Sequence, residues 1–220
     1  MIKAIIFDFD GVIVESADIK TEAFRELFAA YPQRIKEIID YHLINAGVSR
    51  YVKFRYIYER ILEKGLLKNR EIELGNRFSQ IVLEKILNAP LVAGAKEFFD
   101  ANRSRYQFFV ASGTPEEELR EIIEARGLQG HFKEIHGSPK KKTAIINEII
   151  NKYSFAKNEV VYVGDAQSDR ISAEEAGIVF IERKPDLDLK SGSYPWAIKD
   201  LSDFGEILKK IEKINFWRND

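Results

Sequence analysis

The chain has no cysteine and a single methionine. Without thiols it cannot form disulfides, hold a metal through thiolates or use a cysteine nucleophile. Charge of one sign is also missing, because 34 lysines and arginines oppose 35 aspartates and glutamates and leave a net charge of −1. This balance gives no general basic field that would attract nucleic acid or an anionic membrane surface.

Long apolar runs are absent as well. No stretch approaches the roughly 20 residues that a membrane-spanning helix needs, and no basic segment precedes a long apolar one near residue 1. We therefore expect neither a signal peptide nor a transmembrane helix, and a cytoplasmic location is the default. With 220 residues, of which 45% are hydrophobic, the chain can bury one full core and a smaller satellite module.

Two carboxylates, Asp8 and Asp10, stand directly after the first apolar run of the chain. An apolar run that opens an alternation of strands and helices is typical of a strand buried on both faces. Side chains two residues apart on a strand point to the same side, so both carboxylates are expected where the strand leaves its sheet. Adjacent carboxylates repel each other unless a cation, a shared proton or hydrogen-bond donors hold them. A divalent cation is the obvious candidate, with a phosphate ester as substrate.

Helical periodicity dominates from residue 15 to residue 88. Apolar residues recur there at helical spacing, and the interruption comes at Asn88-Ala89-Pro90. This block predicts a small helical bundle whose aromatic side chains form its core. The apolar positions that carry the first two stripes are Ile19, Ala23, Phe24, Leu27 and Phe28, then Phe54, Ile57, Tyr58, Ile61 and Leu62.

Strand-like and helix-like segments alternate from residue 89 onward. Strands are expected over 107–111, 134–136, 160–163 and 178–181, with an edge strand over 196–198 and a last helix from about 201 that packs on the sheet. This alternation predicts an α/β fold, a Rossmann-like core whose parallel sheet is flanked by helices. Residues 1–14 and 89–220 would form that core, and residues 15–88 an inserted α-helical domain.

Four loops at the carboxyl ends of the predicted strands carry polar groups suited to phosphate chemistry. A hydroxyl and loop amides can hold phosphate oxygens, a lysine can neutralise their charge, and carboxylates can hold Mg²⁺. Because parallel strands deliver these loops to one edge of the sheet, we expect the groups to meet. They are Asp8 and Asp10; Ser112, Gly113 and Thr114; Lys140, Lys141 and Lys142; and Asp165 and Asp169.

Taken alone, each pattern has an ordinary alternative. Ser112 could cap the following helix, and Gly-Asp-x-x-x-Asp could be a strand-to-helix turn with its N-terminal cap. Consecutive lysines are usually a solvated face. However, the four motifs occur in order on strand ends between residues 8 and 169, and together they resemble the haloacid dehalogenase superfamily of phosphatases and phosphomutases. They read Asp-Phe-Asp-Gly-Val, Ala-Ser-Gly-Thr, Gly-Ser-Pro-Lys-Lys-Lys and Gly-Asp-Ala-Gln-Ser-Asp.

The resemblance implies roles for the acidic residues. Asp8 resembles the nucleophile that forms an aspartyl-phosphate. Asp10 resembles the general acid that protonates the leaving oxygen and then activates water as a base. Mg²⁺ is expected beside the carboxylates of Asp8 and Asp165 and the backbone carbonyl of Asp10. Asp169 binds this metal through water or orients the lysine. An acid at position 10 favours phosphate esters over carbon–halogen cleavage, which needs no leaving-group proton.

The resemblance also implies how phosphate is held and what the helical insertion does. Ser112 and the amide of Gly113 would hold the transferring phosphoryl group, and the family spacing favours Lys142 over Lys140 as the lysine in the site. The insertion matches the family's cap, which selects the substrate. The segment 45–50 resembles the specificity loop of β-phosphoglucomutase-like members, so Arg50 is expected to grip a second anionic group of the substrate, with support from Lys53 and Tyr51.

Several alternatives stay open in the insertion. Ser49 could simply be an N-cap that leaves Arg50 solvated. Lys20 stands where related mutases and many phosphatases carry a histidine, which weakens the mutase hypothesis; Lys20 could contact an acidic substrate or be exposed. The spacing of the three histidines does not predict a ligand cluster, so they are interpreted as surface or loop residues, with His42 near the mouth of the cap. The other two are His131 and His136.

The function implied is a Mg²⁺-dependent phosphatase of a small phosphorylated metabolite, such as a sugar phosphate, a sugar-acid phosphate or a phosphoglycolate-like acid. One rival is an intramolecular phosphomutase with the same site, and a non-enzymatic rival is a phospho-accepting signalling module. The expected partner is a small-molecule phosphate ester, without nucleic acid or membrane, and the protein is expected to be a monomer or weak dimer.

Overall fold

The computed structural model of the protein describes residues 1–186 and 196–217, with side chains as far as residue 214. Six parallel strands form one sheet in the order β3-β2-β1-β4-β5-β6. This confirms the predicted α/β fold with a parallel sheet, including the short edge strand β6. The strands are β1 (Ala4–Phe7), β2 (Gln107–Pro115), β3 (Phe132–Ser138), β4 (Val160–Gly164), β5 (Val179–Arg183) and β6 (Ala197–Ile198).

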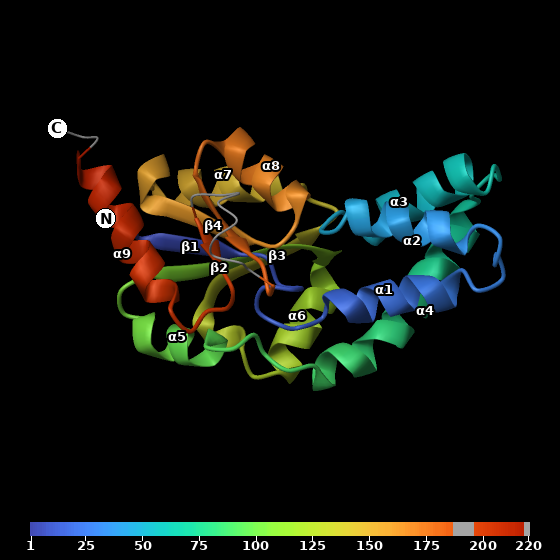
Figure 1. The fold of residues 1–220 in the computed structure, drawn as a ribbon, viewed down its shortest axis with the longest axis horizontal. Helices are drawn as coiled ribbons and strands as arrows, with labels where there is room; N and C mark the ends of the chain where they lie inside the picture. Colours follow the sequence, from blue (N-terminus) through green and yellow to red (C-terminus); the bar gives the residue numbers. More distant parts are fainter. Residues whose placement is uncertain (187–195, 218–220) are drawn as a thin grey trace.

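Helices cover both faces of the sheet (Figure 1). One face packs on α5 (Ala95–Asn102), α6 (Glu116–Ala125) and α9 (Phe204–Trp217), and the other on α7 (Lys142–Tyr153) and α8 (Gln167–Ala176). Residues of β1 alternate between these two cores, because successive side chains of a strand point to opposite faces: Ile5 and Phe7 join the first, Ala4 and Ile6 the second. The central strands are therefore apolar on both sides.

The last helix packs on the core as expected where it is described. Phe204, Leu208 and Ile211 are buried in the core that faces α5, whereas Ile214 is exposed. The final side chains of the predicted apolar stretch Leu208 to Trp217 lie outside the described residues. Across the described residues, no helix combines the length and the apolar character needed to cross a bilayer.

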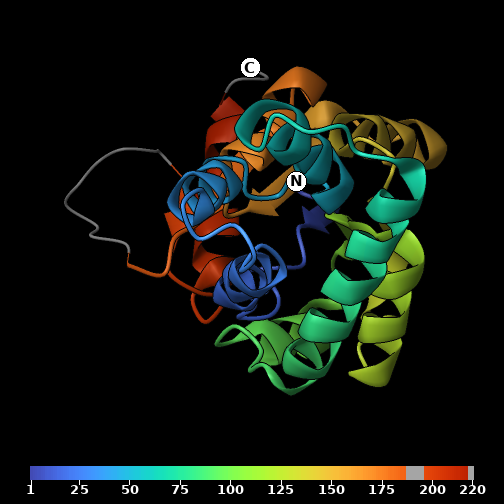
Figure 2. The same ribbon diagram turned by 90° about the vertical axis from the view of Figure 1, so that its right-hand side faces the viewer.

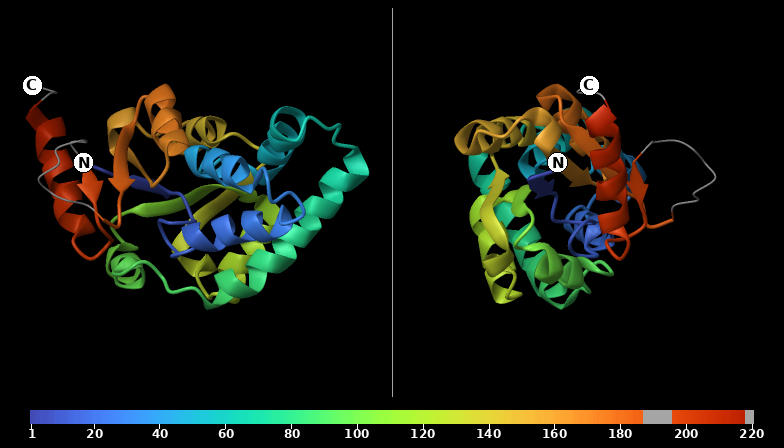
Figure 3. Two further views of the ribbon diagram at one scale, coloured as in Figure 1. Left: turned by 45° about the vertical axis from the view of Figure 1, so that its right-hand side comes forward. Right: turned by 90° about the vertical axis from the view of Figure 1, so that its left-hand side faces the viewer.

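Between β1 and β2 the chain forms a block of helices, which we call the insertion (residues 17–88). It consists of α1 (Ala17–Leu27), α2 (Ile35–Ile44), α3 (Arg50–Tyr56), a π-helical turn (Ile57–Ile61) and α4 (Lys68–Asn88). Figures 2 and 3 show these helices grouped beyond the carboxyl edge of the sheet, with the long α4 returning beside α6. The predicted aromatic core is confirmed, since Phe24, Phe28, Phe54 and Phe78 are all buried and each ring contacts at least two of the others.

Candidate active site

The carboxyl ends of β1 and β4 lie side by side, and this brings the first and the fourth sequence motifs together. The backbone N–H of Asp8 donates to the carbonyl of Val163 at 2.8 Å, so Asp8 lies beside the end of β4. Gly11 follows in the left-handed region with φ = +73°, and a Cβ there would stand 2.1 Å from Oδ2 of Asp165. Only glycine fits that position, because a side chain would meet both backbone strain and the carboxylate.

Three carboxylates gather at this edge. One oxygen each from Asp8, Asp165 and Asp169 lies within 4.8 Å of the others. Lys142 joins them: its Nζ donates to Asp8 at 2.8 Å and to Asp169 at 2.5 Å. Clustered carboxylate oxygens are the donors that a hard divalent cation such as Mg²⁺ prefers, and three carboxylates against one lysine leave negative charge for it to balance. The donor set therefore fits such an ion.

The pKa values of these groups follow from burial and crowding. Burial raises the pKa of Asp8 to about 6, with Lys142 opposing the rise and Asp169 and Asp10 adding to it. Burial, followed by the charges of Asp8 and Asp169, also raises the pKa of Asp165 well above its ordinary value. Burial works against the charge of Lys142, but Asp169 and Asp8 more than offset this and raise the pKa of that lysine.

We expect the raised pKa of Asp8 to appear as a pH dependence of stability in the metal-free protein. Folded Asp8 keeps its proton to about pH 6, whereas its ordinary value is 3.8. Between these values the folded state binds more protons than the unfolded state, so the free energy of unfolding falls as pH rises. Urea unfolding in EDTA should show that the free energy of unfolding of the wild-type protein falls with pH relative to that of Asp8→Asn, because the asparagine amide does not titrate in this range. Parallel curves for the two proteins between pH 4 and pH 6.5 would contradict the prediction.

Asp10 lies apart from that cluster and has its own hydrogen-bond donors. Its carboxylate accepts from Ser16 Oγ at 2.7 Å and Thr114 Oγ1 at 3.0 Å, and it pairs with Lys20. Burial works to raise the pKa of Asp10, but the charge of Lys20 and these hydrogen bonds lower it on balance. Lys20 also donates to Thr114 at 2.9 Å, so in this structure it contacts the predicted acid and is not a fully exposed side chain.

Ser112 and Gly113 lie within β2, which continues past the predicted end at residue 111. Ser112 is buried and its Oγ accepts from the backbone N–H of Thr114 at 3.2 Å. The alternative that Ser112 caps the next helix is wrong, because Pro115 occupies the N-cap position of α6. A Cβ on Gly113 would stand 2.4 Å from the carbonyl oxygen of Gly47 in the insertion. The loop after α2 therefore lies directly against the second motif.

Asp169 combines both interpretations of the fourth motif. Its Oδ2 accepts from the backbone N–H of Ala166 at 3.1 Å, which caps the start of α8. Its Oδ1 accepts from Lys142 and from the Tyr162 hydroxyl, the latter at 3.2 Å. The hydrogen bond from Ala166 thus holds the Asp169 carboxylate in place while its other oxygen faces Lys142.

The three lysines of the third motif separate clearly. Lys140 is exposed and pairs with Glu148 at 2.7 Å, and Lys141 is exposed as well. Lys142 begins α7 and is buried among the carboxylates. Of the three, Lys142 is the one placed at the carboxylate cluster, and its contact with phosphate stays a prediction.

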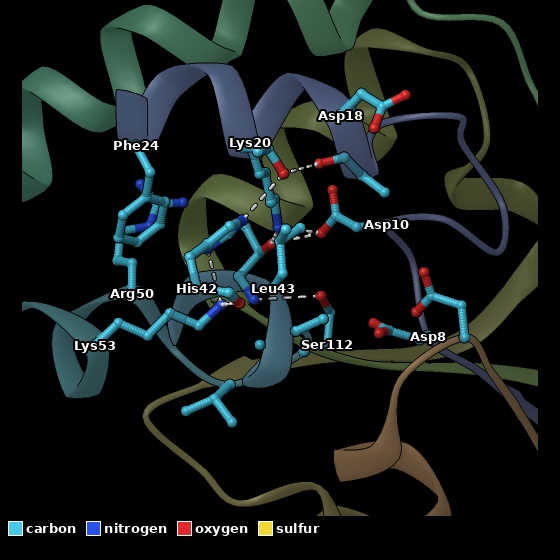
Figure 4. Close-up of a pocket in the computed structure, with 18 of the residues that line it drawn as sticks. Asp8, Asp10, Asp18, Lys20, Phe24, His42, Leu43, Arg50, Lys53 and Ser112 are labelled. Atoms are coloured by element: carbon cyan, nitrogen blue, oxygen red, sulfur yellow. Dashed lines mark hydrogen bonds and ion pairs between the residues drawn. The ribbon is translucent and has the colours of Figure 1, made fainter. Parts of the chain in front are cut away.

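The insertion closes the pocket from the side opposite the carboxylates and Ser112. Figure 4 shows Asp8, Asp10 and Ser112 on one side, with Arg50, Lys53 and Phe24 across from them. All six residues line one pocket. The loop after α2 is held against the fourth motif as well, since Ser168 Oγ donates to the carbonyl of Ala46 at 2.8 Å.

Arg50 is not solvated, so that alternative is wrong: the residue is 5% exposed. Its guanidinium donates to both carboxylate oxygens of Glu118 on α6, at 3.0 and 2.5 Å, and to Ser79 Oγ at 2.8 Å. Its charged group also lies 4.4 Å from the centre of the Phe78 ring. These contacts join α3, α4 and α6. The predicted grip of Arg50 on a substrate anion stays a prediction.

His42 is not a surface or loop residue, and this expectation is corrected. It lies on α2, is 5% exposed and stacks on Phe24 with ring centres 4.2 Å apart. Burial and the charges of Lys53 and Lys20 lower the pKa of His42 to about 3. The apolar spacing of α2, with Ile35, Ile38 and Ile39 preceding it, was the available signal for burial.

The other two histidines are only partly exposed and lie outside the pocket. His136 pairs with Glu134 at 2.8 Å in β3, and His131 lies 3.8 Å from Asp100. They form no part of the pocket lining.

Glu118 and Ser79 are contact residues that sequence reasoning missed. Glu118 belongs to the three glutamates that open α6, where the helix dipole alone explains acidic residues. Ser79 is one polar position on a long amphipathic helix. No local pattern marks either one, because their partner Arg50 is distant in sequence and reaches them only through the tertiary fold.

The structure combines a parallel α/β sheet, carboxylates at the carboxyl edge of that sheet and a helical insertion over them. The family model for haloacid dehalogenase-like hydrolase matches residues 5–182. The chain belongs to this family, and it is a hydrolase of the predicted superfamily.

Relatives and solved structures agree with this assignment. The chain is similar to the phosphorylated carbohydrates phosphatase of Thermotoga maritima, with 24% identity over 80% of this chain and 82% of that protein. It is also similar to the phosphoglycolate phosphatase of Haemophilus influenzae, with 21% identity over 94% and 98%. Its fold matches a β-phosphoglucomutase structure from Clostridium difficile with a TM-score of 0.79 at 16% identity, covering 98% and 100% of the two chains.

Proposed function

We propose that the protein is a Mg²⁺-dependent phosphatase that hydrolyses a small phosphorylated metabolite through an aspartyl-phosphate at Asp8. The observation that carries this proposal is the cluster of Asp8, Asp165 and Asp169 around Lys142, with Asp10 in the same pocket. The phosphatase names of both curated relatives support it.

The positions of the acidic residues support a proposed role for each. Asp8 attacks the phosphorus and forms the aspartyl-phosphate as the ester bond to the leaving oxygen breaks. In the proposed cycle Asp10 is protonated when the ester is bound, gives that oxygen its proton and later takes one from the water that releases phosphate from Asp8, which restores both groups. Without substrate, Lys20 and the hydrogen bonds to Asp10 favour the ionised carboxylate, so the proton has to be taken up as the ester binds. Mg²⁺, held by Asp8, Asp165 and the Asp10 carbonyl, would neutralise charge on the phosphoryl oxygens.

Other residues bind and orient the phosphoryl group. Ser112 and the amide of Gly113 would hold its oxygens, and Lys142 would balance their charge while keeping Asp8 in place. Asp169 orients Lys142 through the contact described above. We assign residues 1–14 and 89–220 to the catalytic core and residues 15–88 to a cap that excludes water and selects the substrate.

The basic residues of the cap support a substrate with a second negative charge. Lys20, Arg50 and Lys53 all line the pocket; Lys20 pairs with Asp10 and Arg50 with Glu118, so of the three only Lys53 has no carboxylate partner among the described residues. Phosphoglycolate and phosphorylated sugar acids have such a charge, and the name of one curated relative specifies phosphoglycolate. We therefore place the substrate among small phosphorylated acids and phosphorylated sugars.

A screen of phosphorylated sugars, sugar acids, phosphoglycolate and nucleotides in Mg²⁺ tests the function. We expect phosphate release from a small ester. β-Glucose 1-phosphate should be included, with glucose 6-phosphate measured beside free phosphate. Isomer formation without phosphate release would favour a mutase, and a long-lived phosphorylated Asp8 with no turnover would favour a phospho-accepting module.

Metal removal should abolish this activity. Without a cation, Asp8 and Asp165 lie close together with raised pKa values, so Asp8 is partly protonated near pH 6 and meets an anionic substrate unaided. Excess EDTA should reduce phosphate release to background, and added Mg²⁺ should restore it, while Na⁺ at the same ionic strength should not. Full activity in EDTA would contradict the proposed metal requirement.

A further inference from the structure

Two cations lie one helical turn apart on the face of α3 that lines the pocket. Arg50 is 5% exposed and Lys53 is 3% exposed. Their partners differ in charge. Arg50 is paired with both carboxylate oxygens of Glu118 and also donates to Ser79. The positive charge of Arg50 is therefore already balanced within the protein.

Lys53 has no such balance. Its Nζ contacts Nδ1 of His42 at 3.1 Å and donates to the His42 carbonyl at 3.3 Å. Its amino group lies 5.6 Å from the centre of the Phe24 ring. Among residues 1–186 and 196–214, no carboxylate forms an ion pair with it. The groups in direct contact with the amine of Lys53 are thus neutral.

The hydrogen bonds of His42 suit a protonated Lys53. An ammonium can only donate, so Nδ1 of His42 accepts and the imidazole proton lies on Nε2. Nε2 is then the donor toward Oγ1 of Thr21, at 3.3 Å. Two of the three N–H groups of Lys53 are used in this arrangement. The third is left for a ligand.

A buried cation without a counter-charge lowers stability, because its desolvation is not repaid. Burial, with the charges of Lys20 and Lys142, lowers the pKa of Lys53 to about 7, and the more distant charge of Asp10 opposes this only in part. An anion that enters the pocket with the substrate would offset both effects. The neighbouring pocket wall is largely apolar, with Phe24, Leu43, Val48 and Phe78, so the attraction would be weakly screened.

We propose that Lys53, and not Arg50, binds a second anionic group of the substrate. This group is a carboxylate or a phosphate on the leaving group. Arg50 then serves to hold α3 and α4 against α6 through Glu118. This assignment rests on the proposed function for its substrate class. It adds that substrate selectivity resides in one lysine whose charge the protein leaves unpaired.

Binding of non-hydrolysable phosphonates tests the assignment without turnover. Calorimetry in Mg²⁺ compares each ω-carboxyalkylphosphonate with the alkylphosphonate of equal length, for example 3-phosphonopropionate with propylphosphonate. A parallel series of α,ω-diphosphonates distinguishes a carboxylate from a phosphate. We expect the wild-type protein to bind the best ligand with two anionic groups about 10 to 100 times more tightly than the alkylphosphonate of equal length. This is the range for a charged hydrogen bond.

Lys53→Met should remove this preference and leave the affinity for alkylphosphonates within about threefold, because methionine keeps the apolar stem. Lys36→Met is the matched control, since Lys36 is exposed on α2 in the same insertion. Arg50→Met should weaken both members of a pair by similar factors. A wild-type protein with no preference in any pair, a preserved preference in Lys53→Met, or its selective loss in Arg50→Met would each overturn the proposal.

These results are separable from the proposed function. A wild-type preference that Lys53→Met abolishes, in a protein that hydrolyses no ester, would refute the phosphatase and leave the anion contact standing. Phosphate release together with an unchanged preference in Lys53→Met would support the phosphatase and refute the anion contact at Lys53.

Discussion

Replacing Asp8 with asparagine is expected to reduce phosphate release at least about a thousandfold, because loss of a covalent nucleophile removes the reaction path itself. Asparagine has the same shape but a neutral amide in place of the attacking carboxylate. The fold should survive, since Asp8 is held by backbone pairing with Val163 and stands in a repulsive cluster that one neutral group relieves. Steady-state phosphate release in saturating Mg²⁺ measures the effect.

Asp100→Asn provides the control for this change, because Asp100 is an exposed carboxylate on α5 outside the pocket. It should turn over substrate like the wild-type protein. Circular dichroism and urea unfolding should show that Asp8→Asn is folded. Wild-type turnover by the folded variant would refute Asp8 as nucleophile.

Lys142→Met is expected to produce the largest loss of stability. Lys142 is buried and is the cation hydrogen-bonded to Asp8 and Asp169. Removing one partner of a buried charge network typically costs about 3–5 kcal/mol, since the remaining charges stay buried without compensation. Urea unfolding of the metal-free protein at pH 8 measures this loss, and phosphate release should fall together with it.

Two comparisons identify the cause of that loss. The deficit should shrink near pH 5, where Asp8 can take up a proton, and also in Mg²⁺, which supplies positive charge. Lys140→Met removes a lysine from the same run, but its exposed pair with Glu148 should contribute little to stability, because solvent screens it. Equal destabilisation by the two variants, or a deficit independent of pH and Mg²⁺, would argue against the charge network.

Local sequence patterns were sufficient to predict which edge of the sheet carries the carboxylate cluster. The apolar run before Asp8 predicts a buried strand, and the alternation after residue 89 predicts parallel strands that end at one edge. Both expectations rest on short-range periodicity and on a topological rule, so they need no knowledge of side-chain packing. The motif order then identified the family, which the match over residues 5–182 confirms.

The insertion was harder to interpret, because the residues with which it lines the pocket look like ordinary helix positions in the sequence. His42 was assigned to the surface, although it lies on the apolar stripe of α2 and its ring packs on Phe24. Arg50 had two predicted environments, a substrate anion or solvent, and the structure shows a third one, Glu118. A charged side chain on a helix reveals nothing about its partner when that partner is 68 residues away.

Strand periodicity and the spacing of the four motifs were enough to predict the fold and the family, because these patterns are local and do not depend on side-chain packing. Which buried cations are neutralised depends instead on packing between distant segments of the chain. This packing pairs Arg50 with Glu118, encloses Lys142 among carboxylates and leaves Lys53 beside a neutral histidine. The physical reason is that the free energy of a buried charge depends on neighbours within a few ångströms, which the chain brings together from helices and loops far apart in sequence.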